Sequence, residues 1–351
     1  MASGTRGYRS YSGRGNKGKI ALAILLSIII LAAAAFLLLQ SRIYYDANGT
    51  PHIRLPEWSV QTRPLSPDDV ELVFGDGDTE EDAAESAASF TRYTNAFSVT
   101  EETLKNGPEA INTAWVSGIT DHQAAAITLK DADGMVWFDS ESAIPGSIKA
   151  TTAVITAVHD IAESDVHTIA RINTLHDPFT AKQWVTDMGL RNLSGYIFFD
   201  GNNSQWLDAN KARTRQKICE MAVEAAEMGF NEILLTGFSY PTDGNMEDMN
   251  DGGVNHVETL ESLLKEIRAA LPEGVLLSVE LSAETIQNGS NEAAGHRLSS
   301  LAPLVDTIYA ETTGAEAAAL RDGVAARSKT CGFVPEVTDA KSMSDPYLLL
   351  K

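Results

Sequence analysis

The chain has 351 residues and a formal net charge of −21, from 48 acidic and 27 basic residues. All of the acidic residues but only 21 of the basic ones follow residue 42, so this part carries about −27. Such a surface repels nucleic acid and anionic lipid but not neutral sugars or cationic groups, which argues against nucleic acid as a partner.

The N-terminal region contains a segment that is long and apolar enough to cross a membrane. Ile20 to Leu39 carry no charge over twenty residues, which matches the roughly 30 Å of a bilayer's hydrocarbon core. The preceding residues are basic and include no acid, so the positive-inside rule predicts a cytoplasmic tail (1–19), a transmembrane helix (20–40) and an extracellular remainder. A cleaved signal peptide is the alternative, because Ala32 to Ala35 are small, but the apolar run continues past them.

Residues 41–92 are predicted to form a stalk. The segment has four prolines between residues 51 and 67, followed by a stretch that is acidic and rich in alanine and serine. Low hydrophobicity and dense like charge prevent a chain from burying enough apolar surface to offset its ordering entropy. We therefore expect a solvated linker here, followed by a folded domain over residues 93–351.

Within residues 93–351, short apolar runs alternate with helical patterns, which is typical of βα units around a parallel sheet. The eight predicted strands are 94–99, 124–130, 166–172, 232–236, 275–281, 305–310, 332–337 and 347–350. About 250 residues with eight such units indicate a TIM-type (β/α)8 barrel. Because the last units are short, a barrel that is incomplete at its C-terminal end or an open doubly wound sheet remains the alternative. Two hairpins interrupt the alternation, one from Asp131 with an Asp-Gly turn and one over Tyr196 to Leu207.

Catalytic and binding residues of such barrels lie where the strands end at their C-terminal side. Several charged or aromatic residues fall there or on the loops that follow, and these are the candidates for a site: Lys130, Asp131, Trp137, Arg171, Trp206, Asp208, Tyr240, Glu280, Glu311 and Glu336. Carboxylates beside aromatic rings suit pyranose sugars, whose hydroxyls form hydrogen bonds while their CH faces pack on rings. We therefore predict a polysaccharide or other glycan as the ligand.

Five segments resemble, in the same order, the glycoside-hydrolase-like domain found in many bacterial secreted and membrane-anchored proteins. They are Ile127-Thr-Leu-Lys-Asp-Ala-Asp-Gly, Thr168-Ile-Ala-Arg-Ile-Asn, His176-Asp-Pro, Gln205-Trp-Leu-Asp and Glu224-Ala-Ala-Glu-Met-Gly-Phe-Asn-Glu-Ile. The resemblance covers roughly residues 93–351 and implies a TIM barrel related to sugar-cleaving enzymes.

The chain departs from that family at positions that matter for catalysis. The family usually has an Asp at the end of the fourth strand and an Arg shortly after it, whereas this chain has Thr236 and Ser239. A glycosidase needs two suitably spaced carboxyl groups, and threonine cannot supply one. Glu280 stands where the family tends to have Asp on the fifth strand, so a proton donor remains, and Glu311 or Glu336 could serve as the second carboxylate.

Purely structural roles are open for several candidates. Lys130 and Asp131 could form an ion pair at the strand end, Arg171 could bridge Asp208, and Trp137 could pack the hairpin. Glu280 is the stronger candidate, because strand alternation points it into the barrel, where an unused carboxylate is costly. The histidines show no metal-binding spacing, so we predict no metal and no cofactor.

Three functional hypotheses remain. The first is a membrane-anchored, extracytoplasmic domain that binds a cell-envelope or extracellular glycan with lost or altered catalysis, a pseudoenzyme. The second is an active glycosidase that uses Glu280 with Glu311 or Glu336. The third is a non-enzymatic scaffold of the cell envelope. Thr236 and Ser239 favour hypotheses without turnover.

The predicted topology can be tested with protease. Protease added to intact cells or spheroplasts is expected to remove the domain after Gln40 and to leave the tail protected, because the basic flank holds residues 1–19 inside. Tags at the two ends, followed on immunoblots, report each part. A protected C-terminal domain would contradict this orientation.

Overall fold

The computed structural model describes residues 43–45, 51–53, 93, 95–341, 343 and 346–350. The predicted tail and transmembrane helix, residues 1–40, and most of the predicted stalk lie outside these ranges. Within the ranges, no helix is long and apolar enough to cross a membrane. The chain divides into two units, Met1–Asp76 and Gly77–Lys351.

One antiparallel strand pair is described in the first unit. β1 (Ile43–Tyr45) pairs with β2 (Pro51–Ile53), with Tyr44 opposite His52. The sequence of β1, Ile-Tyr-Tyr, consists of residue types with high β propensity. The pair falls inside the predicted stalk, so these six residues are paired where we expected unpaired chain.

The second unit contains a closed barrel of parallel strands. In both chain order and spatial order, the eight strands are β3 (Asn95–Val99), β4 (Ala124–Lys130), β5 (His167–Asn173), β7 (Glu232–Thr236), β9 (Leu276–Glu280), β12 (Thr307–Glu311), β13 (Gly332–Val337) and β14 (Tyr347–Leu349). The prediction of a TIM-type barrel is confirmed. The open or incomplete sheet is wrong, because the three residues of β14 pair with β13 on one side and with β3 on the other.

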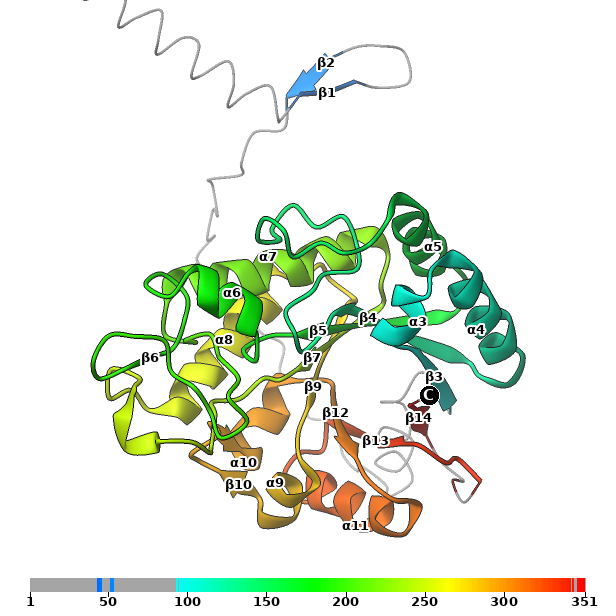
Figure 1. Ribbon diagram of the computed structural model, residues 1–351. Coiled ribbons are helices and arrows are strands. Elements are labelled where there is room, and N and C mark those ends of the chain that lie inside the picture. Colours follow the sequence, from blue (N-terminus) through cyan, green and yellow to red (C-terminus); the bar gives the residue numbers. More distant parts are fainter. Residues whose placement is uncertain are drawn as a thin grey trace, which may run out of the picture. The chain divides into compact units, whose positions relative to one another are not determined.

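Helices connect the strands and surround the barrel (Figure 1). The α-helices of the described residues are α3 (Glu101–Lys105), α4 (Pro108–Asp121), α5 (Thr152–Ala162), α6 (Pro178–Gln183), α7 (Ala212–Met228), α8 (His256–Ala270), α9 (Ala283–Asn288), α10 (Leu298–Leu301) and α11 (Gly314–Ala325). Short 3₁₀ turns form η2 (Met246–Asp248) and η3 (Ala302–Leu304). Two further antiparallel pairs lie in loops, β6 (Arg191–Asn192) with β8 (Met249–Asn250) and β10 (Ser290–Asn291) with β11 (His296–Arg297).

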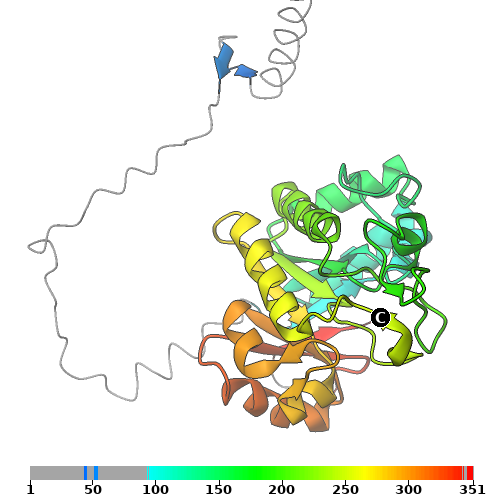
Figure 2. The ribbon, with the colours of Figure 1, turned by 90° about the vertical axis from the view of Figure 1, so that its left-hand side faces the viewer.

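The helix boundaries follow from local chemistry. The Asn255 side chain accepts from the Glu258 amide and begins α8, whereas Gly229, in the left-handed region, ends α7. These two helices lie side by side, green and yellow in Figure 2, and the Arg215 guanidinium donates to both carboxylate oxygens of Glu266 across their interface.

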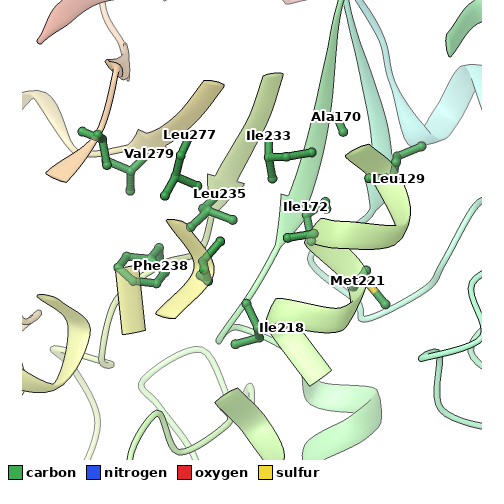
Figure 3. Close-up of a cluster of buried hydrophobic side chains, with 14 of the residues drawn as sticks. Leu129, Ala170, Ile172, Ile218, Met221, Ile233, Leu235, Phe238, Leu277 and Val279 are labelled. Carbon is green, nitrogen blue, oxygen red and sulfur yellow. The ribbon is translucent and has the colours of Figure 1, made fainter. Parts of the chain in front are cut away.

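Apolar side chains form two cores that the strands separate. The larger core lies between the strands and the surrounding helices; in Figure 3, Ile172 and Leu235 of the strands approach Ile218 and Met221 of α7. The smaller core fills the barrel, and its members are Tyr93, Ala96, Ala124, Ala126, Ile169, Leu234, Tyr309, Val334 and Leu348. Three alanines in this set leave room for the rings of Tyr93 and Tyr309, as close packing requires.

A buried polar network lies below the small core, toward the N-terminal ends of the strands. Glu232 is 1% exposed, and its Oε1 accepts from Ser278 Oγ at 2.5 Å and from the Tyr309 hydroxyl at 2.9 Å. His167 Nε2 lies 3.0 Å from the other oxygen, and Tyr93 bonds to Tyr309. Because each carboxylate oxygen has a partner, this acid is satisfied within the protein.

The two cysteines are not paired with each other. Cys219 is half-buried and Cys331 is buried, and both are free. Burial raises the pKa of Cys219 to about 11 and that of Cys331 to about 12, so neither thiol is ionised at neutral pH.

Two helical glycines provide a matched test of packing. A Cβ on Gly118 of α4 would lie 2.3 Å from the Phe97 ring, whereas a Cβ on Gly323 of α11 would lie 3.4 Å from Ile286 Cγ2. We expect Gly118→Ala to lower the free energy of unfolding by roughly 1–3 kcal/mol through overpacking. Gly323→Ala is expected to change it little or to raise it by about 0.5–1 kcal/mol through helix propensity. Denaturant unfolding measures both, and equal effects of the two variants would contradict this packing.

Candidate functional site

A cavity of about 990 Å³ opens at the C-terminal ends of the strands. Asn173 of β5, Glu280 of β9 and Glu311 of β12 line it at the strand ends. The remaining wall comes from the loops after the strands, including residues 200, 202, 204 and 206 and the segment 237–243. We call this cavity the cleft. Its position is the one at which barrels of this type bind their ligands.

The charged side chains that line the cleft are acidic. Its carboxylates are Asp200, Asp243, Glu280 and Glu311, and no lysine or arginine is among its lining residues in the described ranges. Asp243 and Glu311 are exposed, whereas Asp200 is 8% exposed. The cleft therefore presents a negative potential to a ligand.

One guanidinium lies between two of the predicted catalytic acids. Arg171 of β5 places Nη2 at 3.0 Å from Glu280 Oε2 and Nη1 at 2.9 Å from Glu336 Oε1. Burial alone would lower the pKa of Arg171, but the charges of Glu336 and Glu280 raise it above its ordinary value. The expected bridge from Arg171 to Asp208 is therefore replaced by contacts with carboxyl groups on two strands across the barrel.

Glu336 is the buried member of this group. Its side chain is 1% exposed, and burial raises its pKa to about 8; Arg171 opposes this shift, while Glu280 and Glu311 add to it. One positive charge faces three carboxylates, so the group binds a proton readily, and the most buried acid holds it. Glu336 is therefore largely neutral at pH 7.

The spacing of the acids follows from their common partner and from the strand register. Because Glu280 and Glu336 contact one guanidinium, their nearest oxygens are at most about 8 Å apart, below the upper limit of roughly 9.5 Å for an inverting glycosidase. Glu311 pairs in register with Glu336, and Glu280 pairs with Tyr309. The three glutamates thus belong to one corner of the barrel mouth.

Trp206 supplies the aromatic surface of the cleft. Its indole Nε1 donates to Asp200 Oδ2 at 2.8 Å, and its ring lies 4.6 Å from the imidazole of His176. His176 Nε2 is 2.7 Å from Ser204 Oγ, which fixes the imidazole in turn. Tyr240 also lines the cleft, but it is 2% exposed and its ring stacks on His256 at 3.8 Å.

The turn that holds Trp206 occurs twice in the domain. Asp200 Oδ1 accepts from the amides two and four residues ahead, at 3.0 and 2.8 Å, and Oδ2 accepts from the indole six residues ahead. Asp131 makes the same three bonds, at 3.0, 2.9 and 3.0 Å, with Trp137 as its indole. The residue three positions after the aspartate has a positive φ in both turns, 61° at Asn203 and 83° at Gly134. We call these two segments the Asp–Trp turns.

The remaining predicted site residues lie away from the lining of the cleft. Trp137 is 4% exposed, within the first Asp–Trp turn. Lys130 does not pair with Asp131; its Nζ lies 2.9 Å from Asp177 Oδ2, and it donates to the Asn173 carbonyl at 2.7 Å. Asp208 is 7% exposed, accepts from the Asn210 amide, and has a pKa that burial raises.

Sequence reasoning missed Asp200, Asp243 and His176 as lining residues. The spacing of Asp200 from Trp206 equals that of Asp131 from Trp137, and this repeated spacing could have identified Asp200. Asp243 lies in the loop after β7, and nothing in its local sequence predicts a place in the cleft. Of the two residues that replace the family's Asp and Arg, Ser239 lines the cleft and Thr236 does not.

Among the described residues, no group of three or more histidine, cysteine or acidic side chains is arranged to hold a metal ion. His176 and His296 both line the cleft, and burial lowers the pKa of each. Their imidazoles are therefore neutral at pH 7, and the charge of the cleft is set by its carboxylates.

The profile of one protein family, described as "Putative glycosyl hydrolase domain", matches residues 99–311. Among curated protein sequences, none matches the chain. The matched segment of the family profile covers more than half of the chain.

Several solved structures match part of the chain. A hypothetical protein from Ruminiclostridium thermocellum is 25% identical, with a TM-score of 0.43, and the match covers 52% of this chain and 96% of that protein. The spore cortex-lytic enzyme SleL of Bacillus cereus is 12% identical (TM-score 0.39, 70% of this chain, 51% of that one). The α-galactosidase of Thermus thermophilus is also 12% identical (TM-score 0.41, 71% and 50%), so the chain covers about half of each of these two enzymes.

The buried acid gives the protein a defined pH dependence. Because the pKa of Glu336 is about 8 when folded, against about 4.3 in an unfolded chain, the folded state binds this proton more tightly. Its contribution to stability is complete below the unfolded pKa and is lost as pH rises through about 8. When the free energy of unfolding is measured by denaturant titration at about pH 5 and about pH 9, it is expected to fall less for Glu336→Gln than for the wild type.

The matched control is Glu273→Gln, at an exposed position between α8 and β9. This variant removes the same charge without touching the buried group and should keep the wild-type pH profile. Identical profiles for Glu336→Gln and the wild type would contradict a proton on Glu336.

Proposed function

Since the chain belongs to the glycosyl hydrolase family whose profile covers residues 99–311, we propose that its barrel binds a polysaccharide outside the cytoplasm with lost or weakened catalysis. The cleft supports binding, because it combines Trp206 with several carboxylates and hydroxyl groups in about 990 Å³. An indole packs against the CH face of a pyranose while polar groups bond to its hydroxyls. This is a pseudoenzyme on a hydrolase fold.

The observation that carries the proposal is the pairing of Arg171 with both Glu280 and Glu336. A glycosidase needs one protonated carboxyl at the leaving-group oxygen and one ionised carboxylate at the anomeric carbon or its water. Glu336 favours the proton but is 1% exposed and does not line the cleft. Glu280 lines the cleft, but one of its oxygens is engaged by a guanidinium, which weakens it as a base or nucleophile.

Active hydrolysis is the second candidate, and one observation favours it. Glu280 and Glu311 both line the cleft and lie on adjacent strands, with Glu311 two residues beyond the partner of Glu280. A glycosidase built on this pair would use one of them as the acid and the other as the base or nucleophile.

The place of action rests on the N-terminal sequence. Residues 20–39 carry no charge and follow a basic flank, which supports a single-pass anchor in the cell membrane with the barrel outside. A glycan of the cell envelope or of the extracellular matrix would be within reach there. A non-enzymatic envelope scaffold would share this anchor but would not require the cleft.

A glycan panel assayed for both hydrolysis and binding tests the proposal. We expect the full-length protein to show negligible turnover of common α- and β-glycans. Binding to at least one of them should fall several-fold in Trp206→Ala, because the stacking surface is lost. Trp206→Phe keeps a ring without the bond to Asp200 and should retain part of the affinity.

Two outcomes would contradict this proposal. Robust hydrolysis that Glu280→Gln abolishes would establish the glycosidase and end the pseudoenzyme hypothesis. Absence of binding to every glycan, with the unfolding transition intact, would favour the scaffold.

A further inference from the structure

The cleft is rich in hydrogen-bond acceptors. Its four carboxylates can only accept hydrogen bonds. Both carboxylate oxygens of Asp200 already accept hydrogen bonds within its own turn. Asp243, Glu280 and Glu311 line the same cleft from three different segments of the chain. Arg171, which does not line the cleft, pairs with one oxygen of Glu280, and no lysine or arginine among the described lining residues pairs with Asp243 or Glu311.

Two buried acceptor atoms in the lining are without partners in the described part of the chain. Asn173 is 7% exposed and His296 is 5% exposed, and neither Asn173 Oδ1 nor His296 Nδ1 has a hydrogen-bond partner. His296 Nε2 lies 2.7 Å from the Phe238 carbonyl, to which it must donate. In the neutral ring, Nδ1 is then an acceptor. Buried polar atoms in native proteins are nearly always bonded, so these two point to a donor from a ligand.

These observations define the chemical properties of a ligand that would match the cleft. A matching ligand carries positive charge and several N–H or O–H donors, and an ammonium group has three donors and no acceptor. An N-acetyl group is neutral and brings a carbonyl acceptor, while a uronic acid or phosphate brings negative charge against the four carboxylates. Among glycans, only those with free amino groups meet both conditions.

We propose that the cleft selects amino-sugar polymers with free, protonated amines, such as partly de-N-acetylated polysaccharides. This inference rests on the proposed glycan binding and names its substrate class. Trp206 packs against a sugar ring, while Asp243 and Glu311, the exposed acids of the lining, bind ammonium groups. Asn173 and His296 accept from hydroxyl or ammonium donors deeper in the cleft.

Matched pairs of oligosaccharides test this inference. The probes are β-1,4-linked glucosamine and α-1,4-linked galactosamine oligomers, each compared with the same oligomer after N-acetylation, together with neutral and uronic-acid polymers. Calorimetric titration of the full-length protein should give at least one amine form that binds roughly tenfold or more tightly than its N-acetylated partner. Added salt should weaken binding of the amine form and leave binding of the acetylated form unchanged, because salt screens interactions between exposed charges.

Three isosteric variants distinguish the effect of charges in the cleft from the effect of the protein's net charge. Asp243→Asn and Glu311→Gln are expected to weaken amine binding several-fold more than they weaken binding of the acetylated oligomers. Glu273→Gln, at an exposed position away from the cleft lining, removes the same charge and should leave both unchanged.

The outcomes distinguish this inference from the function on which it rests. Equal or tighter binding of acetylated, neutral or anionic glycans would overturn the amine preference while glycan binding stands. An amine preference that persists in Asp243→Asn and Glu311→Gln would also overturn it, because these acids would not be its cause. Failure to bind any glycan would remove both proposals.

Discussion

The mouth of the barrel depends on one positive charge. The guanidinium of Arg171 reaches across the interior from β5 to carboxylates on β9 and β13, and a third glutamate lies in register beside them on β12. Such a group is stable only if the negative charges are shared or neutralised, which is why burial leaves Glu336 with a proton. The arrangement fixes three strands relative to one another and decides which acids remain for a ligand.

The two ends of the barrel differ in how their acids are compensated. At the N-terminal end, Glu232 is bonded by hydroxyl groups and an imidazole and needs no arginine. At the C-terminal end, Glu280 and Glu311 face the cleft, where solvent and ligands can compensate them. The first arrangement closes the bottom of the barrel, and the second leaves charge available at the top. This division matches the usual separation of stability and function in TIM barrels.

The strands could be predicted from sequence because alternation and βα repetition are local signals. The eighth strand was predicted at 347–350, but this short run left an open or incomplete sheet as an alternative, and only the pairing of β14 with β13 and β3 shows that the barrel closes. Acids at strand ends were likewise predictable, but their partners were not. Lys130 pairs with Asp177 rather than with its neighbour, and Arg171 with Glu280 and Glu336, because such pairs are set by the three-dimensional register.

The repeated Asp–Trp turn has a consequence for how recognition by this barrel could change. In the turn at Asp200, one side chain shapes the backbone, orients the indole of Trp206 and contributes charge to the cleft. A substitution at Asp200 would therefore alter loop conformation, ring orientation and electrostatics together. The copy at Asp131 forms the same bonds with its indole buried, so the turn is a self-contained building block. Exchange of the whole loop, rather than single substitutions, is the route by which a barrel of this design can acquire a new preference.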